Sequence, residues 1–171
     1  FAEVRVESTP ENRLKFRETL FSSEGMKNYI GGVILYDETI KQKTSSGKTI
    51  PELILESGAL PGIKVDTGAK KLAGSNDETI TEGLDGLRER LKSYYDIGAR
   101  FAKWRGMFKI SITNNTPSMN AIKSNSHALA RYSALVQEAG MVPIVEPEVL
   151  MNGDHDIKTC LQVTNMVLAE T

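Results

Sequence analysis

The sequence predicts an α/β fold in which parallel strands alternate with helices. Four short apolar runs have the length and the β-branched content of buried strands. Between these runs, apolar residues recur at the spacing of three and four that is typical of a helix. The joints are short, and short joints in a strand–helix–strand order are typical of parallel βα units.

The first predicted helix begins at Pro10, because Thr9 can cap a helix and proline is favoured at the first helical position. Its expected buried side consists of Leu14, Phe16, Leu20 and Phe21. The apolar run 33–36 follows two glycines and predicts a strand that is buried on both faces. A turn at 45–47 then precedes a short helix over 50–56.

The second predicted strand covers 62–66, and a loop rich in Gly, Ser and Asn follows it. A helix is expected next, although Gly83 and Gly86 leave its start open. The apolar positions of this helix are Ile80, Leu84, Leu87, Leu91 and Tyr94. The third predicted strand covers 99–105 and can continue to Ile110.

Thr116 and Pro117 predict the start of another helix, which runs as far as Gly140. Its apolar side consists of Ile122, Leu129, Tyr132 and Val136. The fourth predicted strand covers 142–148, and Asp154 is the expected cap of a last helix. The apolar positions of that helix are Ile157, Cys160, Val163 and Val167.

The composition is that of a globular protein with one core. The 171 residues are 40% hydrophobic and 25% charged, with a formal net charge of −1, so we expect a single domain over 1–171. This balance argues against binding to nucleic acid or to a membrane surface, both of which need a basic excess. One cysteine, Cys160, and no long apolar run predict a cytoplasmic location.

Three of the predicted strands end in charged residues spaced two apart. These pairs are Lys64 and Asp66, Lys103 and Arg105, and Glu146 and Glu148. Residues i and i+2 of a strand point to the same face, and the carboxyl ends of parallel strands carry the functional residues in folds of this kind. Because charge is costly to bury, six charges at one end of a sheet predict a site that holds an anionic substrate and moves protons.

The cations and the carboxylates of this set predict different tasks. Lys64, Lys103 and Arg105 are suited to neutralising phosphate groups. Glu146 and Glu148 face the same side, so the pKa of one of them is expected to rise toward a range useful for acid–base catalysis, a rise that neighbouring cations oppose. A single pair of this kind is more often a solvated rim or an ion pair, but three pairs at equivalent places argue for function.

Other kinds of site have little support. No Gly-x-Gly-x-x-Gly follows a strand, which disfavours an open dinucleotide-binding sheet and favours half of an eight-stranded (β/α)8 TIM barrel, incomplete in this chain. His127 and His155 lack the spacing of a zinc site, so neither a metal nor another cofactor is expected. Cys160 lies in an apolar helical stripe, and no nucleophile motif is present. Carbonyl chemistry would then depend on a lysine Schiff base.

Six segments of the chain closely resemble class I fructose-bisphosphate aldolase, in the family's order and spacing. They are the segments at 30–35, 62–66, 83–87, 101–105, 143–148 and 153–155. The resemblance implies a lyase of glycolysis that reversibly cleaves fructose 1,6-bisphosphate into dihydroxyacetone phosphate and glyceraldehyde 3-phosphate through a lysine Schiff base. It implies no cofactor, and it implies a homotetramer as the oligomeric state.

The resemblance also implies roles for individual residues. Glu146 matches the family's general acid/base, and Lys103 matches the lysine that stabilises charge on the oxygen at the cleaved bond. Glu148 matches the glutamate beside the Schiff-base lysine. Lys64 and Arg105 match residues that contact the substrate and its phosphates.

Three further residues of the matching segments are assigned by position only. Asp66 and Trp104 belong to the same motifs as Lys64 and Arg105 and are expected to contact substrate. Asp85 lies in the segment that resembles a subunit contact of the tetramer.

The resemblance covers strands two to five of the eight, so the chain is expected to be an internal fragment. The family's Schiff-base lysine lies on the sixth strand, after Thr171, and a catalytic aspartate lies on the first strand, before Phe1. The flexible C-terminal tail with its tyrosine also has no counterpart. The chain alone is therefore expected to be inactive, and the alternative is a non-catalytic partial barrel that binds a sugar phosphate or a protein partner.

Overall fold

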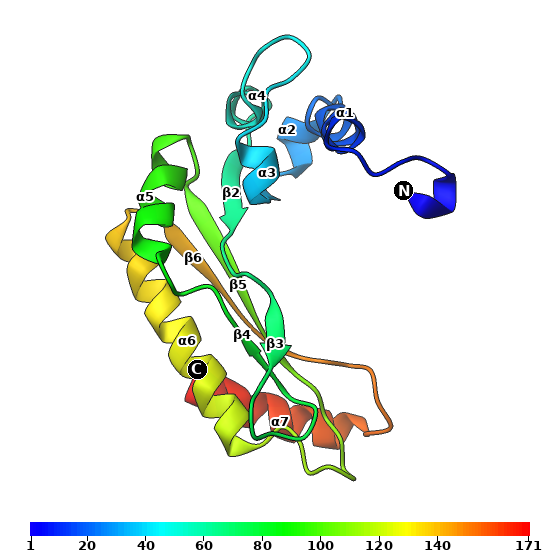
Figure 1. Cartoon of the computed structure of the whole chain (residues 1–171), viewed down its shortest axis with the longest axis vertical. Helices are drawn as coiled ribbons and strands as arrows, with labels where there is room; N and C mark the ends of the chain where they lie inside the picture. The colour runs from blue at the N-terminus through cyan, green and yellow to red at the C-terminus, as the bar shows by residue number, and fades with distance from the viewer.

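A computed structural model describes residues 1–171 and shows a parallel four-stranded sheet flanked by helices (Figure 1). The order of the strands across the sheet is β1-β2-β5-β6, and all three neighbouring pairs are parallel. The strands are β1 (Gly32–Leu35), β2 (Leu60–Lys64), β5 (Phe101–Phe108) and β6 (Val142–Val149). The predicted parallel βα architecture is confirmed, with strand boundaries within three residues of those expected.

The helices lie in two groups (Figure 1). The first group consists of α1 (Pro10–Phe21), α2 (Met26–Tyr29), α3 (Asp37–Ile40) and α4 (Ile50–Glu56), after a 3₁₀ turn at Ala2–Val4. The second group consists of α5 (Leu87–Asp96), α6 (Met119–Glu138) and α7 (Ile157–Glu170). Helix α6 runs along β5 and β6, and α7 packs on α6 and β6. None of these helices combines the length and the hydropathy that crossing a membrane requires.

The loop expected after the second strand contains an antiparallel hairpin, β3 (Ala69–Lys71) and β4 (Thr79–Thr81). Ile80, which was expected to begin the apolar side of the next helix, lies in β4 and pairs with Lys70. The helix begins only at Leu87, because Gly83 and Gly86 have positive φ angles of 129° and 61°, which a right-handed helix excludes.

Two of the predicted caps are wrong by two residues. The side chain of Ser118, rather than that of Thr116, caps α6 by accepting from the backbone N–H of Ala121. The Thr116 hydroxyl instead donates to the carbonyl oxygen of Lys109. Asp156, rather than Asp154, caps α7. The sequence offers two capping side chains at each place, and only the local path of the chain selects between them.

The N-terminal part is less buried than predicted. The cap of α1 at Thr9 is confirmed, but Phe16 is 56% exposed and Leu20 is also exposed. The ring of Phe16 packs edge-to-face with the ring of Phe1, at a centroid distance of 6.0 Å. In β1, Leu35 is buried but Ile34 is 41% exposed, so the strand is buried on one face only.

Strand β5 separates the two faces of the sheet. Its even-numbered residues, including Ala102, Trp104 and Phe108, are buried against the helices, whereas its odd-numbered residues are half-buried on the opposite face. The hydrophobic core on the helix side includes Ile63, Leu91, Leu129 and Tyr132. On the opposite face, the ring of Phe101 occupies the space where a Cβ of Gly62 would lie. We call this opposite face, which carries Lys103 and Arg105, the open face.

Buried polar side chains attach the hairpin to α6. The Asn125 amide accepts from the backbone N–H of Thr81 (3.2 Å) and donates to the carbonyl oxygens of Thr79 (2.9 Å) and Ala121 (3.0 Å). The Thr81 hydroxyl donates to the carbonyl oxygen of Arg105, at 2.7 Å. The hairpin is therefore hydrogen-bonded both to α6 and to the strand that carries two of the six predicted site residues.

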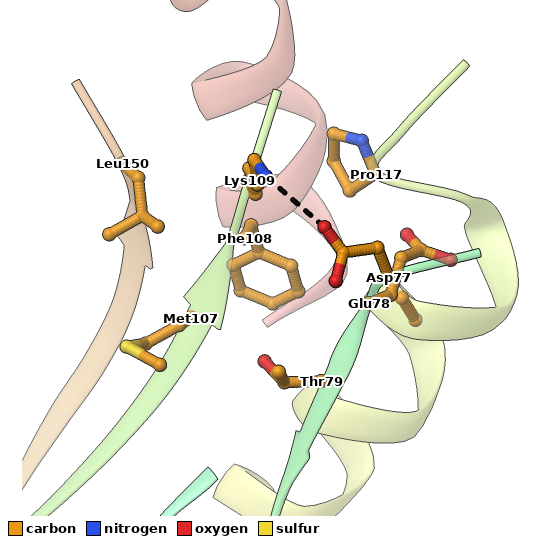
Figure 2. A pocket seen from close by; sticks show the side chains of 9 residues that line it. Asp77, Glu78, Thr79, Met107, Phe108, Lys109, Pro117 and Leu150 are labelled. Carbon is orange, nitrogen blue, oxygen red and sulfur yellow. Dashed lines mark hydrogen bonds and ion pairs between the residues drawn. The ribbon is translucent and has the colours of Figure 1, made fainter. Parts of the chain in front are cut away.

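Glu78 forms a second attachment at the loop end of the hairpin, beside a pocket of about 220 Å³ whose lining residues Figure 2 shows. Its carboxylate accepts from the backbone N–H of Ser118 (2.6 Å), from the Ser118 hydroxyl (2.7 Å) and from the Ser75 hydroxyl. Burial raises the pKa of Glu78, but these hydrogen bonds together lower it by more, so the net shift of the pKa is downward.

We expect Asn125→Ala to lower the free energy of unfolding by about 2–4 kcal/mol, because the substitution leaves buried backbone groups of the hairpin without partners. Urea titration of the two proteins measures this difference. Asn120→Ala, at an exposed position of the same helix, is the control and should change stability by less than about 0.5 kcal/mol. Equal effects of the two substitutions would contradict the role of Asn125.

We expect Glu78→Gln to destabilise the protein by about 1–2 kcal/mol at neutral pH and by less in acid. The folded-state pKa of Glu78 is below its usual value of 4.5, so its stabilisation is present above that pH and is lost as the pH falls through the lower folded value. Urea titrations near pH 7 and near pH 3 test this. A stability difference that stays constant between the two pH values would show that the charge of Glu78 is irrelevant.

Candidate functional site

Strands β2, β5 and β6 bring the six predicted charged residues together at one end of the open face. In the parallel register, Lys64 lies opposite Lys103 on the neighbouring strand. Arg105 lies opposite Glu146. Side chains of one parity share a face of a sheet, so this register places both cations of β5 between Lys64 and the two glutamates of β6. The predicted convergence of these charges is confirmed.

Each cation of the cluster forms an ion pair with one carboxylate. Lys64 pairs with Asp66, which lies two residues farther along the chain. Lys103 Nζ lies 3.1 Å from Glu146 Oε2, and Arg105 Nε donates to Glu148 Oε2. The two pairs between β5 and β6 are diagonal, because each carboxylate belongs to the residue two positions beyond the register partner of the cation. The cluster as a whole is electrically balanced.

The three ion pairs of the cluster lie at different depths. The side chain of Asp66 is 2% exposed, whereas those of Arg105 and Glu148 are 38% and 42% exposed. Lys64 and Asp66 also line a cleft of about 430 Å³. A charged ligand can therefore reach the lysines and Arg105 from solvent, while Asp66 forms part of the wall.

The ion pair with Arg105 sets the direction in which the pKa of Glu148 shifts. The hydrogen bond from Arg105 lowers the pKa of Glu148, and the charge of Lys103 lowers it further. In turn Glu148 raises the pKa of Arg105, with smaller contributions from Glu146 and Asp66. The expected rise in the pKa of a glutamate therefore does not occur at Glu148, because the two cations outweigh the opposing effect of burial.

Asp66 is held at one oxygen only. Its Oδ1 atom accepts from Lys64 Nζ and from the backbone N–H of Gly68, the latter at 3.1 Å. Its Oδ2 atom is buried and has no hydrogen-bond partner. A buried carboxylate oxygen without a partner is energetically costly, so the position of Asp66 must be imposed by the backbone around it.

Trp104 does not belong to this cluster. Its side chain is 0% exposed and packs on Tyr132 of α6, with ring centroids 5.4 Å apart. Because Trp104 has the opposite parity in β5 to Lys103 and Arg105, its ring points into the helix-side core. The expectation that Trp104 contacts substrate is therefore wrong, and its place in the motif reflects packing.

Asp85 lies apart from the six charges, in an exposed turn immediately before α5. It lines the same cleft as Lys64 and Asp66, at the side formed by the start of the helix. The structure thus places Asp85 at the surface, where a contact with another subunit is sterically open.

The sequence does not indicate two residues that contact the backbone of the site. The Thr81 hydroxyl donates to the Arg105 carbonyl, and Arg90 Nη1 donates to the carbonyl oxygen of Val65 at 2.9 Å. Neither residue lies in a charged pair or in a chemical motif, so no sequence signal distinguishes them from ordinary surface residues. No group of three or more His, Cys, Asp or Glu side chains has the arrangement of a metal site.

A family model described as class-I fructose-bisphosphate aldolase matches residues 1–171. The "Probable fructose-bisphosphate aldolase class 1" of Xanthomonas campestris is 54% identical over 98% of this chain and 50% of its own length. The "Fructose-bisphosphate aldolase 4, cytosolic" of Arabidopsis thaliana is 54% identical over 99% of this chain and 42% of its own length. The chain thus spans about half the length of the curated relatives it matches.

One solved structure has a very similar fold. It is the fructose-bisphosphate aldolase of Plasmodium falciparum in a ternary complex with TRAP and a small-molecule inhibitor, with a TM-score of 0.96 and 41% identity. The match covers 99% of this chain and 49% of that structure. The predicted partial (β/α)8 TIM barrel is confirmed by this likeness. The family match over all 171 residues, with these relatives, shows that the chain belongs to the class I fructose-bisphosphate aldolases.

Proposed function

We propose that the protein is a fructose-bisphosphate aldolase of glycolysis. It would reversibly cleave fructose 1,6-bisphosphate into dihydroxyacetone phosphate and glyceraldehyde 3-phosphate through a Schiff base formed by a lysine outside these 171 residues. The observation that carries this proposal is the cluster of three cations and three carboxylates at the ends of β2, β5 and β6. The names of the relatives support the same activity.

The pair formed by Lys103 and Glu146 suits the bond-breaking step. A carboxylate removes the proton from the hydroxyl at C4 of the bound sugar, the bond between C3 and C4 breaks, and its electrons pass to the Schiff base. Glu146 is our candidate for this general base. Lys103 Nζ lies 3.1 Å from Glu146 Oε2. It would stabilise the negative charge that develops on the C4 oxygen of the sugar.

The second pair of β5 and β6 supports this arrangement from the neighbouring positions. Glu148 is our candidate for the carboxylate beside the Schiff-base lysine. Its lowered pKa keeps it ionised at neutral pH, so it can stabilise a protonated imine. Since Arg105 holds Glu148 in place, the two residues would act as one unit.

Phosphate binding is assigned to Lys64 and Arg105, with Asp66 as the partner that orients Lys64. Each cation is already paired with a carboxylate, so a phosphate must share or replace that partner. Arg105 retains donors for this purpose, because only its Nε atom is committed to Glu148. Binding should consequently weaken with increasing salt.

The remaining proposals concern the whole protein. We propose that the chain forms one domain with the rest of the barrel and that the complete protein is a homotetramer with Asp85 at a subunit contact. The exposed position of Asp85 is compatible with such a contact. The cytosolic relatives in Arabidopsis support a cytoplasmic location.

In the aldolase that contains this chain, we expect Glu146→Gln to lower kcat by about 10²- to 10⁴-fold with little change in KM, since a glutamine cannot accept the proton. A coupled assay of fructose 1,6-bisphosphate cleavage measures both constants. Glu24→Gln, in an exposed turn, is the control and should leave them unchanged. Near-normal turnover in Glu146→Gln would remove Glu146 from the acid–base role.

Lys64→Met and Arg105→Met should each raise KM for fructose 1,6-bisphosphate by about 10- to 100-fold, because each removes a charge-assisted contact to phosphate. Lys92→Met is the matched control, since Lys92 is an exposed lysine of α5 with its own carboxylate partner. An unchanged KM in either variant would exclude that residue from phosphate binding.

A further inference from the structure

The segment that carries Asp66 lies beyond the end of β2 and is held on one side by β5. The backbone N–H of Val65 donates to the carbonyl oxygen of Lys103, at 3.1 Å, which extends the ladder of the sheet by one bond. Asp66 follows, with one buried oxygen that has no partner. The sheet alone therefore does not account for the position of Asp66.

The other side of this segment is held by the chain that leaves the hairpin. The backbone N–H of Thr67 donates to the carbonyl oxygen of Glu82 (2.9 Å), and the N–H of Glu82 donates to that of Gly68 (3.2 Å). Asp66 thus lies in a short stretch that is hydrogen-bonded on both sides, to β5 and to the residues after β4.

One arginine of α5 connects the two stretches. Arg90 Nη1 donates to the carbonyl oxygen of Val65 at 2.9 Å, and Nη2 donates to that of Gly83. The guanidinium has its donors in a rigid plane, so two backbone carbonyls bound by it are fixed relative to each other. Arg90 also lines the same cleft as Lys64 and Asp66.

The contact between the two stretches leaves no room for a side chain at Gly83. A Cβ there would lie 2.9 Å from the backbone nitrogen of Thr67 and 3.1 Å from the Cα of Asp66. Its φ angle of 129° is also one that other residues rarely adopt. Gly83 therefore permits the backbone to lie directly against the backbone of Asp66.

We propose that Arg90 and Gly83 are positioning residues that hold Asp66 and, through it, the ammonium group of Lys64. Arg90 donates a hydrogen bond to the carbonyl oxygen of Val65. The backbone of Gly83 lies directly against the backbone of Asp66. The buried carboxylate then keeps Lys64 at a defined place in the cleft. The consequence for ligand binding rests on the proposed function, in which Lys64 binds a phosphate group of the sugar.

We call the contacts of Arg90 and Gly83 with the segment 65–68 the clamp. The first experiment tests the clamp without any ligand. Amide hydrogen exchange, followed by NMR, should become about tenfold faster at Val65, Thr67 and Gly68 in Arg90→Met, while amides in the middle of α6 keep their rates. Arg88→Met is the matched control, because Arg88 is on the same helix but forms an exposed pair with Glu138. Unchanged exchange at these three amides in Arg90→Met would overturn the proposal.

A glycine pair provides a second, independent test of the clamp. Gly83→Ala should accelerate exchange at the same amides, whereas Gly74→Ala should not. Gly74 also has a positive φ angle, 74°, but a Cβ there would meet nothing within 4 Å. If both substitutions have the same effect, backbone strain rather than contact with Asp66 is responsible, and the role of Gly83 is refuted.

The last experiment measures the effect on binding in the complete protein, with fructose 1,6-bisphosphate as the probe and calorimetry as the readout. Arg90→Met should raise Kd by about tenfold, and Arg90→Lys should recover part of this loss. In the background of Lys64→Met, Arg90→Met should cause no further loss, because its effect passes through Lys64. Additive losses would overturn the positioning role.

The two levels of the proposal fail separately. If the unmodified protein does not bind fructose 1,6-bisphosphate, the proposed function is wrong, while the exchange measurements still decide whether Arg90 and Gly83 hold Asp66. If the protein binds the probe and Arg90→Met leaves Kd unchanged, the proposed function stands and Arg90 has no positioning role.

Discussion

The parallel register between β5 and β6 is the constraint on which the site depends. It places Arg105 opposite Glu146, so each cation of β5 meets a carboxylate two residues beyond its register partner. A shift by one residue would turn either Lys103 and Arg105 or the two glutamates into the helix-side core, where charge is costly. The buried residues between the charges, such as Trp104, oppose that shift by packing on α6.

Charge balance follows from this register and determines the properties of the individual groups. With Arg105 and Lys103 next to it, Glu148 has a pKa below its usual value, because the two cations outweigh the effect of burial. Because of the same balance, the cluster has no unpaired cation that could bind phosphate without sharing or replacing a carboxylate. Affinity for an anionic ligand must then come from the geometry of the donors on Lys64 and Arg105, which makes their orientation important.

The orientation of these donors depends on elements outside the main sheet. The hairpin reaches β5 through Thr81 and α6 through Asn125, and the residues after it support the backbone of Asp66. Helix α5 contributes Arg90 to the same region. The segment between the second and third strands of the sheet therefore acts as a support for two of the three ion pairs, rather than as a simple connection.

The order of strands and helices along the chain and the convergence of the six charges follow from the amino-acid sequence. Apolar runs, spacing of two in strands, and the parallel nature of βα units are local or topological properties, so they can be read without coordinates. Which face of β5 is buried depends on long-range packing against α6, and this packing keeps Trp104 out of the charged cluster. The hairpin, the burial of α1 and the contacts of Arg90 likewise could not be read from the sequence, because they depend on backbone turns and on partners far away in the chain.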